Sequence, residues 1–341
     1  DLDLILQAYH SLFDLRPLLF FDEIQNIEGW EHFARRLANQ KYNIYITGSN
    51  AKMLSREIAT TLGGRFWNKD VYPYSFAEYL NARDIILSKN WMYGKQAAEV
   101  SKAFNDYFLY GGFPELTDVI AKRVWLNDIY SKIFFSDLIV RNKVRNEEAL
   151  GLLVRRLAEN VKQPVSYTRL ANLISSIGIK ISKATVIEFI RYLKESCLIF
   201  PIENYAAKFA ERNSNMKHYF IDNGLLSIFL LDGNTSLLEN IVAIHLYKRY
   251  GAQLYFYNQN IEVDFVIPEA KTAIQVSYSL MDETTCRREV EGLIKLNRVF
   301  PMDNMCIITR DEERIITHES GVSIHVIPVW KWLLEEEPLR T

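Results

Sequence analysis

Short apolar runs alternate with amphipathic stretches along this chain, and the pattern predicts a mixed α/β protein. The first run, at 18–21, holds four apolar residues and ends in two adjacent carboxylates, Asp22 and Glu23. A short run of this kind is typical of a strand buried in a parallel sheet. A helical pattern follows at 29–39, and a second apolar run at 43–50 predicts another strand. Strand, helix and strand with short connections predict a βαβ unit.

Polar side chains follow both of these strands. Ligands of parallel α/β sheets bind at the carboxyl ends of the strands, and Asp22, Glu23, Ser49 and Asn50 all fall there. An Asp in this place can support Mg²⁺ on nucleotide phosphates, and the next acid can polarise the attacking water. The pattern therefore predicts Asp22 as the metal- and cofactor-binding residue and Glu23 as a catalytic residue. Ser49 or Asn50 is predicted as a polar sensor near the γ-phosphate. The simpler alternatives are a solvated acidic pair and an ordinary turn.

A glycine break marks a third catalytic candidate. The helical stretch at 51–65 stops at Gly63 and Gly64 and presents Arg65. A positioned arginine can neutralise charge that develops on a transferred phosphoryl group. Arg65 is therefore predicted to act in phosphoryl transfer, and a surface salt bridge is the alternative.

The middle of the chain is predicted to be helical and then to change character. Helical patterns fill most of 95–160, interrupted by a turn at 110–114. Helices at 166–174 and 182–193 follow, and then a strand at 198–202. That order favours a winged helix-turn-helix. Because the second helix mixes acidic with basic residues, DNA contact and a plain packing role both remain open.

The last part of the chain, 215–341, alternates strands with helices and is predicted to be a separate small α/β domain. Nucleases of the restriction-endonuclease fold carry an Asp on one strand and Glu-x-Lys on the next, often with a Glu from an earlier helix. Two carboxylates hold the metal and the Lys stabilises charge on the phosphate. Glu239 and Asp264 fit these positions, whereas Gln275 and Ser277 replace the Glu and the Lys. Glutamine is a poor Mg²⁺ ligand and serine carries no charge, so a degenerate nuclease-like site is predicted.

Composition narrows the function classes only a little. The 341 residues carry a net charge of −2, which gives no global drive toward nucleic acid or a membrane. The three cysteines are widely spaced and are expected to be reduced, which favours a cytoplasmic protein. No run of 18 apolar residues is present, so a membrane partner is not expected.

Several segments, in this order, resemble the prokaryotic AAA-type (archaeal-ATPase-like) ATP-binding proteins, whose members usually carry a C-terminal nuclease-like domain. These segments are Leu-Leu-Phe-Phe-Asp-Glu-Ile-Gln at 18–25, Ile-Thr-Gly-Ser-Asn at 46–50, Leu-Gly-Gly-Arg-Phe at 62–66, Tyr-Pro-Tyr-Ser-Phe-Ala-Glu-Tyr at 72–79, Tyr-Gly-Gly-Phe-Pro-Glu at 110–115, His-Tyr-Phe-Ile-Asp-Asn-Gly-Leu at 218–225, Leu-Glu-Asn at 238–240 and Glu-Val-Asp-Phe-Val-Ile at 262–267.

The resemblance implies an α/β multidomain protein with four regions. They are the remainder of an AAA-like P-loop NTPase core with a parallel sheet at 1–80, a helical lid at 81–160, a winged helix at 161–210 and a restriction-endonuclease-like domain at 211–341, expected to be inactive. By motif, Asp22 and Glu23 fall on the Walker B position, and Ser49-Asn50 on the sensor. Arg65 falls on the arginine that ends the helix after the sensor.

The resemblance also implies a phosphate loop, Gly-x-x-x-x-Gly-Lys-[Ser/Thr], which no part of the 341 residues contains. The loop is expected to lie N-terminal to residue 1 in a longer parent protein. Without it the phosphates lose their backbone N–H cradle and the lysine, so the chain as given is expected to bind ATP weakly or not at all.

Three functions follow from this reading, in decreasing order of support. The first is an ATPase that uses ATP and Mg²⁺ in the complete protein, with a homo-oligomer and a DNA or protein client as open partners. The second is a DNA-binding module that uses the winged helix and the nuclease-like domain. The third is a Mg²⁺-dependent nuclease, which the replaced residues disfavour.

Overall fold

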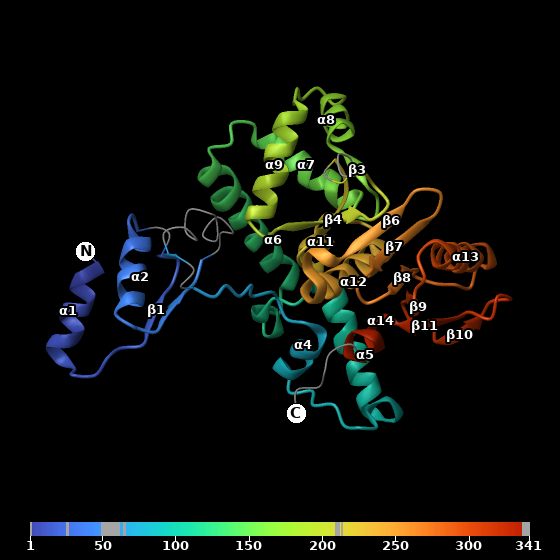
Figure 1. Ribbon diagram of the computed structural model, residues 1–341, viewed down its shortest axis with the longest axis horizontal. Coiled ribbons are helices and arrows are strands. Elements are labelled where there is room, and N and C mark those ends of the chain that lie inside the picture. The colour runs from blue at the N-terminus through green and yellow to red at the C-terminus, as the bar shows by residue number, and fades with distance from the viewer. Residues whose placement is uncertain are drawn as a thin grey trace. The chain divides into compact units, whose positions relative to one another are not determined.

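A computed structural model describes residues 2–24, 27–48, 62–63, 66–208, 212 and 214–335 of the protein (Figure 1). The chain divides into two compact units. The first is made of Asp1–Val71 with Tyr192–Cys197, and the second of Tyr72–Arg191 with Leu198–Thr341. We describe each unit by itself.

The first unit contains the βαβ arrangement that the sequence predicts. Its elements are α1 (Leu2–Leu12), β1 (Leu19–Phe21), α2 (Trp30–Asn39) and β2 (Ile44–Ile46). β1 and β2 pair in parallel, with Phe20 opposite Tyr45. Buried residues of α2, among them Trp30 and Leu37, pack against one face of the pair. The predicted parallel unit is therefore confirmed.

The opposite face of this sheet is open within the described residues. Phe20 is 69% exposed and Tyr45 is 55% exposed, and their rings stack with centroids 4.9 Å apart. The apolar run at 18–21 is typical of a strand buried on both faces, but side chains alternate along a strand. Leu19 is buried, whereas Leu18 and Phe20 point away from the core and are exposed.

The second unit begins with helices, as predicted. They are α4 (Phe76–Ala82), η3 (Trp91–Tyr93), α5 (Lys95–Tyr110), η4 (Pro114–Thr117), α6 (Lys122–Lys132), the π-helical η5 (Ile133–Val140) and α7 (Glu147–Glu159). α4 starts at a capping box in which Ser75 and Glu78 satisfy each other's backbone N–H groups. Gly111 has a φ of 78°, and the predicted turn at 110–114 separates α5 from η4.

The elements of the predicted winged helix-turn-helix are also present in the second unit. β3 (Val165–Ser166) leads into α8 (Tyr167–Ser175) and α9 (Lys183–Glu195), and β4 (Ile199–Asn204) and β5 (Asn215–Phe220) follow. β4 pairs antiparallel with β5, and β5 pairs antiparallel with β3. α8, α9 and β4 lie within two residues of their predicted positions. That these elements form a winged domain stays a prediction.

One mixed sheet continues from these strands into the C-terminal region. Its order is β10-β11-β9-β8-β7-β6-β4-β5-β3, and the parallel pairing of β4 with β6 joins the two parts. The added strands are β6 (Tyr255–Asn258), β7 (Glu262–Ile267), β8 (Thr272–Val276), β9 (Asn304–Thr309), β10 (Arg314–Thr317) and β11 (Ser323–Pro328). The helices are α11 (Asn223–Ser227), α12 (Asn234–Tyr250), α13 (Glu283–Val299) and α14 (Val329–Glu335). The expected boundary at 210/211 therefore falls between two paired strands, β4 and β5.

Two of the segments that carry the family resemblance meet in the second unit. The buried carboxylate of Asp222 accepts hydrogen bonds from the backbone N–H groups of Gly112 (2.7 Å), Gly224 (2.7 Å) and Leu225 (3.3 Å). Burial raises the pKa of Asp222 to about 6, although these three donors oppose the shift. Asp222 thereby fastens the turn after α5 to the start of α11.

Candidate functional site

The ends of β1 and β2 bring three polar residues together in the first unit. The hydroxyl of Thr47 donates a hydrogen bond to the Asp22 carboxylate, and the backbone N–H of Glu23 donates to the Thr47 hydroxyl at 3.4 Å. The backbone N–H of Thr47 donates in turn to Phe21 at 2.9 Å. The parallel register thus places the two carboxylates of β1 beside the first polar residue after β2.

The local backbone turns sharply at this point. Glu23 has a φ of 48°, in the left-handed region that non-glycine residues seldom adopt. Asp22 and Thr47 are exposed and Glu23 is half-buried, so a ligand at the strand ends can reach all three. Left-handed residues are enriched at functional turns, which is consistent with a binding edge here.

Three of the predicted ATPase-site residues lie outside the described residues. They are Ser49, Asn50 and Arg65. Their predicted roles as sensor and phosphate-neutralising arginine stay predictions. Thr47 was not predicted as a site residue, although its place at the end of the second strand is a signal that marks it.

A second cluster forms in the C-terminal region, where the structure brings together Glu239 of α12, Asp264 of β7 and Gln275 of β8. Lys217 of β5, which is fully buried, is the common neighbour of the two acids, Glu239 and Asp264. Its Nζ lies 3.2 Å from Glu239 Oε1, 3.1 Å from Asp264 Oδ1 and 3.5 Å from Glu262 Oε1. Three carboxylates therefore share one ammonium group.

Burial and charge set the ionisation of this cluster. Burial lowers the pKa of Lys217, but the three carboxylates more than offset this effect, so its pKa lies above the usual value. Burial raises the pKa of Glu239 to about 7, against the opposing charge of Lys217. The hydroxyl of Tyr219 also donates to Glu239 Oε1 at 2.7 Å. We conclude that Lys217 is held in its charged form.

Gln275 and Ser277, at the positions predicted for a nuclease Glu and Lys, form hydrogen bonds with the backbone. Gln275 Oε1 accepts from the N–H of Asp264 at 2.9 Å, and Gln275 Nε2 donates to the carbonyl of Glu262 at 3.1 Å. The Ser277 hydroxyl donates to the carbonyl of Ser279 at 2.9 Å. The Gln275 amide thus donates to and accepts from the β7 backbone and fastens β8 to β7.

Sequence analysis missed Lys217 and Tyr219 as members of this cluster. A signal was present, because Lys217 lies in the short strand β5, in which every residue from Met216 to Phe220 is buried. A lysine in such a run needs a buried counter-charge. The sequence does not show which acids supply it.

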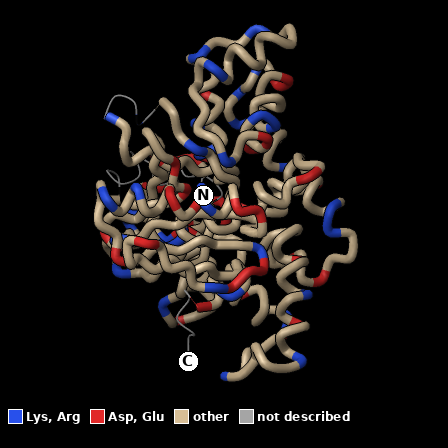
Figure 2. The backbone as a smooth tube through the Cα atoms, turned by 90° about the vertical axis from the view of Figure 1, so that its right-hand side faces the viewer, with Lys and Arg blue, Asp and Glu red and all other residues tan. Residues whose placement is uncertain are grey.

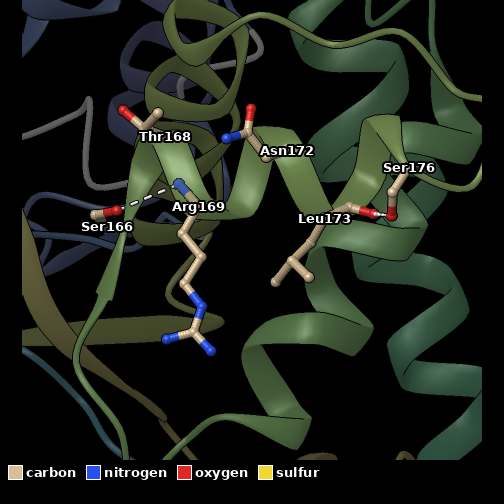
Figure 3. Close-up of a pocket in the computed structure, with 6 residues that line it drawn as sticks. All are labelled: Ser166, Thr168, Arg169, Asn172, Leu173 and Ser176. Carbon is tan, nitrogen blue, oxygen red and sulfur yellow. Dashed lines mark hydrogen bonds between the residues drawn. The ribbon is translucent and has the colours of Figure 1, made fainter.

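A surface hollow of about 400 Å³ lies along α8, lined by Ser166, Thr168, Arg169, Asn172, Leu173 and Ser176. Arg169 and Leu173 extend from the same side of the helix (Figure 3). The hydroxyl of Ser166 caps α8 by accepting from the N–H of Arg169 at 3.2 Å. Five of the six lining residues are of polar types, and Arg169 is exposed.

Two further properties bear on function. Within the described ranges, no group of three or more His, Cys, Asp or Glu side chains is arranged to hold a metal ion. In the same part of the chain, no helix combines the length and the apolar character that crossing a membrane requires.

Two family models match different parts of the chain. Residues 1–80 match the model of an AAA domain, and residues 101–236 match that of a domain of unknown function. Among solved structures, the chain is similar to the Walker-type ATPase PABY2304 of Pyrococcus abyssi, with 14% sequence identity and a TM-score of 0.38 over 62% of each chain. That likeness is too distant to carry an argument about fold.

Two relatives that match more than nine-tenths of the chain give firmer evidence for its family. The chain is 34% identical over 330 residues to the uncharacterized protein MJ1544 of Methanocaldococcus jannaschii, covering 93% of this chain and 74% of the relative. It is 31% identical over 324 residues to an uncharacterized protein of Haemophilus influenzae, covering 92% and 76%. The chain therefore belongs to the protein family that includes MJ1544, and its residues 1–80 match an AAA domain.

Proposed function

We propose that the protein binds ATP with Mg²⁺ and hydrolyses it at the carboxyl ends of β1 and β2. The observation that carries the proposal is the convergence of Asp22, Glu23 and Thr47 at that edge, within the residues that match an AAA domain. Parallel α/β sheets bind their ligands at this edge. Within the proposal, Asp22 supports the metal and Glu23 polarises the attacking water.

The donor set fits a nucleotide-bound Mg²⁺. Asp22 is exposed at the strand end, and the hydrogen bond from Thr47 orients its carboxylate. Magnesium is usually bound through one or two carboxylates together with substrate phosphates. Asp22 would hold the ion, which would supply neutralisation of the charge that develops on the transferred phosphoryl group. Ser49, Asn50 and Arg65 complete the proposed site by motif, as sensor and phosphate-neutralising residues.

We expect Glu23→Gln to lower kcat for ATP hydrolysis by about 100-fold or more while ATP still binds, because water polarisation is lost and nucleotide contacts are kept. Steady-state phosphate release measures kcat, and a fluorescent ATP analogue measures binding. The 341 residues contain no phosphate loop, so the assay uses the protein encoded by the whole gene.

The matched control is Glu28→Gln, which makes the same change at an exposed residue nearby; it is expected to leave kcat unchanged. The proposal fails if the wild-type protein does not turn over ATP. It also fails if Glu23→Gln retains full turnover.

A second candidate function is DNA binding by the region around α8 and α9. Residues 141–195 carry eleven Lys or Arg but five Glu and no Asp, although the whole chain has a net charge of −2. Lys and Arg predominate at the top of the view in Figure 2, where α8 and α9 lie. The element order α8-α9-β4 is also the one expected for the winged helix proposed for 161–210. We propose the other two regions of the chain, a helical lid at 81–160 and a nuclease-like domain at 211–341, on the resemblance to the AAA-type ATP-binding proteins.

Reversing the charge of Lys183 and Arg191 together to Glu is expected to weaken DNA binding at least 10-fold and to flatten its salt dependence, because each lost phosphate contact removes about one unit of slope. Fluorescence anisotropy with a labelled duplex at several salt concentrations measures both quantities. Lys295→Glu, on α13, is the control and is expected to change neither. Equal affinity of the double variant and the wild type would remove this candidate.

A further inference from the structure

The carboxylate cluster around Lys217 already holds a cation. Lys217 Nζ makes its two closest ion pairs with Asp264 Oδ1 and Glu239 Oε1, at 3.1 Å and 3.2 Å. Divalent metals of the Mg²⁺ class bind carboxylate oxygens at about 2.0–2.1 Å. An ion at that distance from both oxygens would lie against the ammonium group, with like charge. The ammonium and a divalent ion therefore compete for one position.

Asp264 and Glu239 also accept hydrogen bonds from groups other than Lys217. Asp264 Oδ2 accepts from the backbone N–H of Val276 at 2.9 Å, and Glu239 Oε1 also accepts from Tyr219. Gln275, at the position of the nuclease Glu, hydrogen bonds with the β7 backbone at both ends of its amide. Asp264 thus has both oxygens occupied, and the cluster lacks the carboxylate that a metal site of this kind would take from β8.

The Lys217 ammonium is buried beside its counter-charges, of which Glu262 is 40% exposed. The side chain of Lys217 is 0% exposed, and Nζ lies 5.6 Å from the centroid of the buried Phe256 ring. Withdrawal of the ammonium would leave Glu239 and Asp264 without their cation, which is strongly unfavourable for buried charges. The ammonium is therefore an integral part of the site.

We propose that Lys217 replaces the divalent metal of this nuclease-like cluster, so that the cluster binds no Mg²⁺ or Mn²⁺ and fastens β5 to α12 and β7 instead. The metal that the nuclease resemblance implies does not fit the residues present. The C-terminal region then keeps its shape without a metal and performs no metal-dependent cleavage of nucleic acid.

The test measures Mn²⁺ binding in the absence of nucleotide, by the electron paramagnetic resonance signal of free Mn²⁺ and by the thermal midpoint. An Asp22→Asn background removes binding at the proposed ATPase site. In this background we expect no difference in Mn²⁺ binding between the protein with Asp264 and its Asp264→Asn variant. Lys217→Met is expected to bind one Mn²⁺, and its midpoint is expected to rise by about 3–5 °C at a Mn²⁺ concentration near 100 times Kd.

Adding Asp264→Asn to Lys217→Met is expected to abolish that binding. The proposal is overturned if the protein with Lys217 binds Mn²⁺ in a way that Asp264→Asn removes. It is also overturned if folded Lys217→Met, checked by circular dichroism, binds no Mn²⁺. If Lys217→Met does not fold, the proposal is tested only by comparing Mn²⁺ binding of the protein with Asp264 and of its Asp264→Asn variant, both in the Asp22→Asn background. These readouts do not depend on ATP turnover.

Discussion

Lys217→Met is expected to lower the free energy of unfolding by about 3–5 kcal/mol, because removing one partner of a buried ion pair leaves uncompensated buried charge. Lys217 is fully buried, and the acids that it faces are Glu239, Asp264 and Glu262. The methionine keeps the unbranched side chain as far as Cε, so the loss reports mainly the removed charge. Urea unfolding followed by circular dichroism measures it.

Two comparisons make this result specific. Lys295→Met is the matched control, because Lys295 forms an exposed pair with Glu291 at 2.9 Å, and such pairs contribute less than about 1 kcal/mol. Adding Glu239→Gln to Lys217→Met is expected to recover part of the loss, since it removes one of the stranded charges. A loss no larger than that of the control would contradict a charged, buried Lys217.

Gly111→Ala is expected to lower the free energy of unfolding by about 3–4 kcal/mol. Gly111 has a φ of 78° and a ψ of −162°, a conformation that is essentially restricted to glycine and costs other residues about 1–3 kcal/mol. A Cβ there would lie 2.0 Å from Asp222 Oδ1 and 2.3 Å from Oδ2. The carboxylate would have to move and lose its hydrogen bonds to Gly112 and Gly224, which adds to the cost.

The control for this prediction is Gly151→Ala. Gly151 lies inside α7, and a Cβ there would meet Phe134 at 3.6 Å, an ordinary contact. Alanine is the better helix former, so a gain of about 0.5–1 kcal/mol is expected. Thermal and urea unfolding of the two variants measure the contrast. If Gly111→Ala were as stable as the wild type, Asp222 would not be the clamp that the structure describes.

Local patterns in the sequence were enough to predict most elements. The apolar runs and helical periodicities predicted β1, α2 and β2, the helices from α5 to α7, and the order of α8, α9 and β4. These elements depend on residues within one or two turns of each other, which is the range that periodicity reports. The pairing of β1 with β2 also followed, because a short crossover between strands forces a parallel neighbour.

The geometry of the proposed ATPase site was predicted in part. Asp22 and Glu23 lie at the edge where they were expected, because the end of a parallel strand fixes their place. Thr47 was missed, although it follows the second strand directly. The roles of Ser49, Asn50 and Arg65 stay predictions, since these residues lie outside the described part of the chain.

The amino-acid sequence by itself determined most of the strands and helices and the acidic edge of the βαβ unit, and it shows Gln275 and Ser277 where the nuclease resemblance predicts Glu and Lys. Only the tertiary structure decided which cation lies among the acids Glu239, Glu262 and Asp264. Lys217 and Asp264 are 47 residues apart, and they meet because β4 joins the strands β5 and β6 into one sheet. A buried charge must find its partner in space and not in sequence, so the choice of Lys217 as the cation of this cluster belongs to the fold.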